Sequence, residues 1–198
     1  MNSYVDMDSS SDVAPQGRRL IYFSSVTYAS YAQRPHFMAA AFADDRFDSV
    51  LWVDPNLTRL PTIADLKRVR PKNVTMERTD DARIKVFRPT ALPVEPLPMS
   101  DFANHIIAWR TICAQLLEFA GETDYCVLGI GRPSKLGEWA LKRAPHERSF
   151  VDILESFPAF YRGLSRISMK ARLRAVRRKV ADVYGRTRRS RRKSPSPV

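Results

Sequence analysis

Residues 20–55 read LIYFSSVTYASYAQRPHFMAAAFADDRFDSVLWVDP, and this stretch decides the fold class. Two apolar, β-favouring runs, residues 20–24 and 49–53, enclose a polar loop and a helix-like block. Pro35 suits the first turn of a helix that continues through residue 43. A strand, a helix and a second strand in this order form a right-handed unit whose two strands are parallel.

Strands and helices continue to alternate along the rest of the chain. The apolar patterns predict strands over residues 83–88, 124–130 and 149–154, and helices over residues 63–69, 102–119, 134–141 and 164–183. We therefore expect an α/β fold, a Rossmann-like three-layer sandwich with a mostly parallel sheet. Ligands of such sheets bind beyond the carboxyl ends of the strands, which brings together the loops at residues 24–36, 129–134 and 152–161.

The basic charge of the chain is concentrated at its C-terminal end. Residues 162–198 contain 14 of the 33 basic residues and one of the 21 acids, so the net charge of +12 belongs to this segment. The remaining 19 bases and 20 acids leave residues 1–161 close to neutral. We expect residues 1–17 to be a disordered leader, residues 18–184 to be the folded domain, and residues 185–198 to be a disordered basic tail.

The two cysteines, Cys113 and Cys126, lie in unrelated contexts, which is typical of a reduced intracellular protein and not of a zinc or redox motif. No apolar run reaches the roughly 18 residues that a membrane span needs. The N-terminus lacks the apolar core of a signal peptide. These features predict a cytoplasmic location, with peripheral contact at the inner face of the membrane as an option.

Polar side chains at the start of the chain are candidates for contact with a ligand in the cleft. Ser24 and Ser25 end the first strand and can hydrogen-bond a sugar, although serines are also ordinary turn residues. Arg34 and His36 open the first helix and can reach an acceptor or a donor. The alternative is that Arg34 pairs with a carboxylate such as Asp54 and that His36 merely starts the helix.

Two further clusters follow later strands. Gly131 allows close backbone approach, Arg132 supplies a fixed charge, and Ser134 opens a helix whose N-terminus can hold an anion. The alternative for this cluster is a plain strand-to-helix turn. Asp152 and Glu155 are a candidate carboxylate pair for binding hydroxyls or accepting a proton, and the alternative is a pair of solvated acids. We assign no catalytic residue and predict no metal site.

Three of these segments together resemble a known family. LIYFSSV, QRPHFMAAAFA and VLWVDP resemble the N-terminal half of GT-B glycosyltransferases, in a family 1-like bacterial branch that makes cell-surface polysaccharides. VDILESFPAFY resembles a strand of that branch that ends in acids and continues into an aromatic turn. Asp152 falls on the first of these acids, and Glu155 and Ser156 fall where a pair of acids is usual. The resemblance covers roughly residues 18–182.

The resemblance implies transfer of a sugar from a nucleotide-sugar donor to a hydroxyl of a polysaccharide or lipid-linked acceptor. In GT-B enzymes the N-terminal half shapes the acceptor side, and a second domain holds the donor through groups that stabilise the departing diphosphate. This half would therefore bind no cofactor itself, and the fold requires no metal.

The family pattern stops after residue 184, where the sequence changes to GRTRRSRRKSPSPV. This segment has no apolar periodicity with which to bury a core. We interpret the change as a truncated or frame-shifted gene product that is inactive unless a separate chain supplies the donor half. The alternative function is a non-enzymatic module whose basic C-terminus binds nucleic acid or an anionic membrane. The neutral body and the lack of a recognition motif disfavour nucleic acid.

Overall fold

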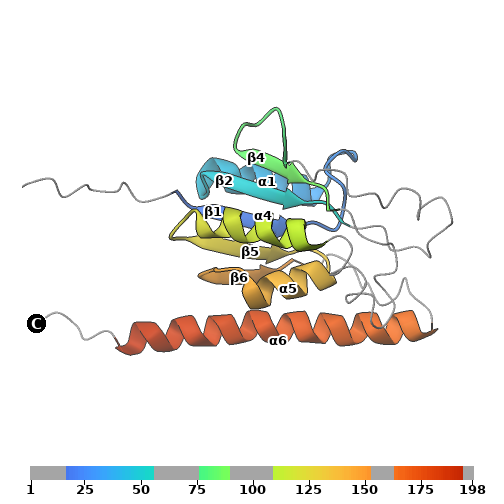
Figure 1. Cartoon of the computed structure of the whole chain (residues 1–198), viewed down its shortest axis with the longest axis vertical. Helices are drawn as coiled ribbons and strands as arrows, with labels where there is room; N and C mark the ends of the chain where they lie inside the picture. Colours follow the sequence, from blue (N-terminus) through green and yellow to red (C-terminus); the bar gives the residue numbers. More distant parts are fainter. Residues whose placement is uncertain (1–16, 56–75, 90–108, 153–162, 194–198) are drawn as a thin grey trace, which may run out of the picture.

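The computed structural model describes residues 17–55, 76–89, 109–152 and 163–193, and of residues 78, 163–165 and 182–193 it describes the backbone alone. Glu155 and the helix predicted over residues 63–69 lie outside these ranges. The described chain is an α/β fold built on a six-stranded, mostly parallel sheet, as the sequence predicted (Figure 1).

The order of the strands gives the sheet a Rossmann-like arrangement. The strands are β1 (Arg19–Phe23), β2 (Ser49–Val53), β3 (Met76–Arg78), β4 (Ile84–Phe87), β5 (Cys126–Ile130) and β6 (Arg148–Val151). They lie in the order β3-β4-β2-β1-β5-β6, and every neighbouring pair is parallel except β3 with β4. The chain leaves β1 toward β2 and β4 and later crosses to β5 on its other side. This reversal, at the carboxyl ends of β1 and β5, is where sheets of this kind bind ligands.

The side chains of each strand alternate between two buried clusters, one on each face of the sheet. Ile21 packs in one cluster with residues of α4 (Trp109–Gly121) and α5 (Lys135–Arg143). Tyr22 packs in the other cluster with Ala39 and Ala43 of α1 (Arg34–Asp45). Alanines at these positions let the helix approach the sheet closely. Because both faces are covered, the central strands β1, β2 and β5 are apolar over nearly their whole length instead of alternating.

The described helices lie near their predicted positions, with one difference, and the predicted start of the helix over residues 102–119 lies outside the described residues. Gly121 ends α4, and Ser134 caps α5, as the sequence indicated. Helix α6 (Gly163–Lys193) continues through the segment that we expected to be a disordered tail from residue 185. Arginine is a good helix former, and the first proline beyond this segment is Pro195, so a single Gly185 does not end the helix. Within the ranges that the structure describes, no helix is long and apolar enough to cross a membrane.

Candidate functional site at the carboxyl edge of the sheet

Four of the predicted site residues lie at the same edge of the sheet. Ser24 directly follows β1, Gly131 follows β5, Asp152 follows β6, and Arg34 is the first residue of α1. The register of the strands places three of them at the same level along the strand direction. Phe23 of β1 lies opposite Ile130 of β5, and Ile130 lies opposite Val151 of β6. The parallel strands therefore bring together residues that are more than 100 positions apart in the sequence.

Arg34 and Asp152 form an ion pair across this edge. The Arg34 Nη2 donates to the Asp152 Oδ1 at 2.8 Å, and the Asp152 backbone N–H donates to the Ile130 carbonyl at 2.9 Å. The Arg34 side chain is 63% exposed, whereas that of Asp152 is 11% exposed. A guanidinium has five N–H donors, so a ligand hydroxyl or carboxylate can bind Arg34 without displacing Asp152. This agrees with the alternative that Arg34 pairs with a carboxylate, and the partner is Asp152 instead of Asp54.

A tyrosine from the buried strand reaches the same carboxylate. The Tyr22 hydroxyl donates to the Asp152 Oδ2 at 3.3 Å, while the ring is fully buried. Burial raises the pKa of Tyr22, the negative charge of Asp152 raises it further, and the Arg34 charge lowers it by a smaller amount. Tyr22 is therefore a neutral hydrogen-bond donor that holds the second oxygen of Asp152. This contact could not be predicted from the sequence, because Tyr22 has the pattern of a core residue.

Two glycines, Gly129 within β5 and Gly131 just after it, make room for this tyrosine. A Cβ on Gly131 would lie 2.6 Å from the Tyr22 hydroxyl oxygen, and a Cβ on Gly129 would lie 2.7 Å from the Tyr22 ring and 2.5 Å from the Phe150 ring. Stacked rings of Tyr22 and Phe150 therefore occupy the space that a side chain at either position would need. This packing explains why glycine stands at position 131, and close approach of a ligand to its backbone stays a prediction.

His36 has a structural role at the start of α1. Its Nδ1 accepts from the backbone N–H of Gln33 at 3.1 Å, and its Nε2 lies 3.1 Å from the carbonyl of Tyr28. The neutral tautomer with hydrogen on Nε2 satisfies both contacts, and the ring packs 4.8 Å from that of Trp52. His36 thus fixes the loop after β1 to the helix, which agrees with the alternative that it starts the helix.

Asp54 anchors the same loop from the end of β2. Its Oδ1 accepts from the Tyr28 backbone N–H at 2.8 Å and from the Trp52 Nε1 at 2.9 Å. Its Oδ2 accepts from the Arg88 Nε at 3.3 Å, and the carboxylate is 8% exposed. The sequence analysis did not place Asp54 among the site candidates. A carboxylate between an apolar strand and a proline, in VLWVDP, was the available signal.

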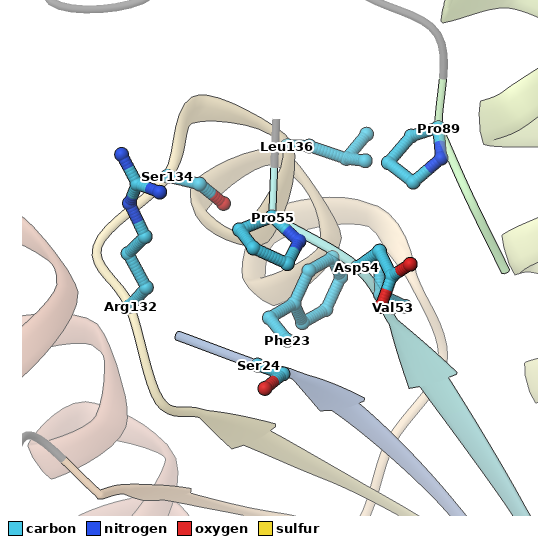
Figure 2. A pocket seen from close by; sticks show the side chains of 9 residues that line it. All are labelled: Phe23, Ser24, Val53, Asp54, Pro55, Pro89, Arg132, Ser134 and Leu136. Carbon is cyan, nitrogen blue, oxygen red and sulfur yellow. The ribbon is translucent and has the colours of Figure 1, made fainter. Parts of the chain in front are cut away.

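A small pocket opens beside these groups, between the ends of β1 and β2 and the start of α5 (Figure 2). Phe23, Ser24, Asp54, Arg132 and Ser134 contribute to its lining. Figure 2 shows the Ser134 side chain directed toward Pro55, with Arg132 at the outer rim. The pocket encloses about 10 Å³, which is enough for roughly one water molecule. The pocket as described is therefore too small to hold a sugar ring.

Ser24 and Ser134 bond nearby backbone groups, whereas Arg34 and Asp152 bond each other. The buried Ser24 Oγ accepts from the Val26 backbone N–H at 3.1 Å, and the Ser134 Oγ accepts from the Gly137 backbone N–H at 3.0 Å as the N-cap of α5. Ser25 and Arg132 are half-buried. The described ranges hold no group of three or more His, Cys, Asp or Glu side chains that could bind a metal ion.

Comparisons with protein-family models, with curated protein sequences and with solved structures found no match to this chain. The structure defines the protein as an α/β domain with a mostly parallel sheet. Polar side chains, Arg34 and Asp152 among them, lie together at the carboxyl edge of that sheet.

Proposed function

We propose that this chain forms the acceptor-side half of a GT-B glycosyltransferase and that the carboxyl edge of its sheet binds the hydroxyls of a saccharide. The finer description of the fold, a three-layer N-terminal GT-B half, is part of this proposal. The observation that carries it is the Arg34–Asp152 ion pair at 2.8 Å. Arg34 lies in the QRPH segment and Asp152 in the VDILESF segment, two parts of the resemblance that are far apart in the sequence.

The chemistry of this edge suits a neutral, hydroxyl-rich ligand. Saccharide hydroxyls both donate and accept hydrogen bonds, so they can use a carboxylate and a guanidinium that lie side by side. Arg34 balances the negative charge of Asp152, and the Tyr22 hydroxyl donates a hydrogen bond to its second oxygen. The pair is therefore a poor site for an isolated diphosphate and a good site for a polar, uncharged group. Exposed Tyr31 and Phe37, close to Arg34 in sequence, add apolar surface at the same end of α1.

In the mechanism that the proposal implies, this half positions the nucleophile. Holding an acceptor hydroxyl in a fixed orientation removes much of the entropic cost of bringing two substrates together. Asp152 accepts a hydrogen bond from a sugar hydroxyl, and Arg34 keeps that carboxylate in place while donating to a neighbouring oxygen. A nucleotide-sugar donor, held by a second domain in the enzymes that this chain resembles, supplies the group that is transferred.

The proposal is tested by saccharide binding with a pair of matched variants. The full chain is titrated by isothermal calorimetry with bacterial-type oligosaccharides and, separately, with nucleotide sugars. Arg34→Gln is expected to weaken saccharide binding at least tenfold, whereas Arg46→Gln, an exposed arginine at the other end of α1, leaves it unchanged.

Two results would overturn the assignment. Nucleotide sugars that bind while every saccharide fails to bind would place the donor, and not the acceptor, on this chain. Equal effects of Arg34→Gln and Arg46→Gln on saccharide binding would show that the carboxyl edge of the sheet is not the binding site. Far-ultraviolet circular dichroism of both variants shows whether each retains the fold.

A further inference from the structure

The outward side of α6 carries a continuous basic surface, which we call the basic face. It consists of the exposed side chains of Arg166, Lys170, Arg174, Arg177 and Arg178. At 100° per residue these five positions fall within about 120° of the helix circumference. Met169, Arg172 and Val176 are buried on the opposite side, which packs toward β6 and α5.

Helix α6 itself supplies few acids to balance these charges. The sequence from residue 163 to residue 193 contains one acid, Asp182, whose side chain lies outside the described set. Among the residues that the structure describes, no carboxylate forms an ion pair with the basic face. Some exposed arginines elsewhere in the domain do have partners, as Arg34 has Asp152 and Arg83 has Asp44. The basic face therefore produces a region of positive electrostatic potential, unlike a surface on which positive and negative side chains are mixed.

The helix that carries this face is long and extends beyond the face toward the C-terminus. Its 31 residues span about 46 Å at 1.5 Å per residue. Figure 1 shows α6 running alongside β6 and extending well past it toward the C-terminus. The sequence from residue 185 to residue 193 adds six more basic residues and no acid. A long helix with many basic residues along it suits a ligand whose negative charges are repeated along a line.

The composition of the face distinguishes between two such polyanions. Helices that lie on a membrane insert an apolar side between the lipids. The apolar side chains Met169 and Val176 are instead buried against the domain, and among the described side chains of α6 the exposed large apolar residue is Ile167. Four of the five basic residues are arginines, whose planar guanidinium binds phosphate oxygens in pairs. The face carries no Asn or Gln for reading base edges.

We propose that the basic face of α6 binds the phosphate backbone of nucleic acid without selecting a base sequence. The near-neutral charge of residues 1–161 does not prevent this binding, because the basic residues that would contact phosphates lie together on one exposed face. This binding surface is independent of the carboxyl-edge site, since it lies on the outer side of the last strand.

The test uses the full chain and a fluorescently labelled 20-base-pair DNA duplex, with the binding constant measured across a salt series. Neutralising Lys170, Arg174, Arg177 and Arg178 to glutamine is expected to reduce the slope of log K against log salt by about 3 to 4, at about 0.9 per phosphate contact. The matched control neutralises four exposed arginines elsewhere, namely Arg46, Arg110, Arg143 and Arg148. This control has the same net charge and is expected to keep the original slope.

The proposal fails if the control variant loses as much slope as the α6 variant, because the effect would then follow net charge alone. It also fails if the α6 variant binds DNA like the unmodified chain. Vesicles containing phosphatidylserine form a second arm. Vesicle binding that depends on the basic face, with no DNA binding at physiological salt, would assign the face to membranes and overturn the nucleic-acid proposal. Circular dichroism confirms that each variant is folded.

Discussion

The hydrogen bonds of Asp54 give the sharpest prediction for the stability of the site. Asp54→Ala removes the acceptor for the indole N–H of the fully buried Trp52 and for the backbone N–H of Tyr28. Each buried donor left without a partner costs about 1–3 kcal/mol. Releasing a buried carboxylate recovers part of its desolvation cost, and water can reach the half-buried Tyr28. We therefore expect Asp54→Ala to lower the free energy of unfolding by about 2–4 kcal/mol.

Asp54→Asn separates this effect from the loss of charge. The amide oxygen can accept from both Trp52 and Tyr28, so the variant loses mainly the 3.3 Å contact with the half-exposed Arg88. Such an exposed ion pair contributes about 0–1 kcal/mol. Asp54→Asn should therefore be destabilised by about 1 kcal/mol or less, several times less than Asp54→Ala.

The assay is urea denaturation followed by tryptophan fluorescence and circular dichroism. With a slope of about 2 kcal/mol per molar urea, a loss of 3 kcal/mol moves the midpoint down by about 1.5 M. Asp45→Ala, an exposed acid at the end of α1, serves as the control and should change stability by less than about 0.5 kcal/mol. If Asp54→Asn and Asp54→Ala have equal midpoints, the hydrogen bonds to Trp52 and Tyr28 are not what Asp54 provides.

Three further predictions concern the packing around the site. Gly131→Ala places a Cβ 2.6 Å from the Tyr22 hydroxyl, so it should cost about 1–3 kcal/mol. Tyr22→Phe should recover part of this cost in the double variant, and strictly additive losses in thermal denaturation would contradict the clash. Ser134→Ala should lose about 1 kcal/mol from the N-cap of α5, whereas Ser134→Asp should lose much less, as measured by urea denaturation. Burial raises the pKa of the Cys113 thiol to about 11 and that of Cys126 to about 12. At pH 8 both thiols should react with an aromatic disulfide reagent far more slowly in the native protein than in urea, and rapid native labelling would contradict their burial. Because these pKa values are raised on folding, the stability they contribute is fully present below about pH 9 and declines as the pH rises toward 11 and 12.

The strands could be predicted from the sequence because burial on both faces makes them continuous apolar runs. The run at residues 49–53 matches β2 in full, and the first strand is displaced by a single residue. The short β3 was not predicted, because Met76–Arg78 has no apolar pattern of its own. Its extended conformation follows from antiparallel pairing with β4, which local sequence does not report.

The location of the candidate site could also be predicted, but its contacts could not. Parallel strands place Ser24, Gly131 and Asp152 at one edge whatever their side chains do. The partner of Arg34 depends on how α1 packs, and Asp54 was an equally good candidate before the packing was known. The role of Gly131 depends on a tyrosine ring from another strand. Such contacts join residues that are more than 100 positions apart, so no local pattern encodes them.

Nuclear magnetic resonance mapping of a saccharide titration tests the central claim most directly. If the carboxyl edge binds sugar hydroxyls, the backbone amide signals of Ser24, Arg34, Gly131 and Asp152 should shift together and saturate at one concentration of oligosaccharide. Signals of Asp48 and Arg83, which line a separate groove with Gly17 just before β1, should stay in place. Shifts confined to that groove, or no saturable shifts with any saccharide, would contradict the account.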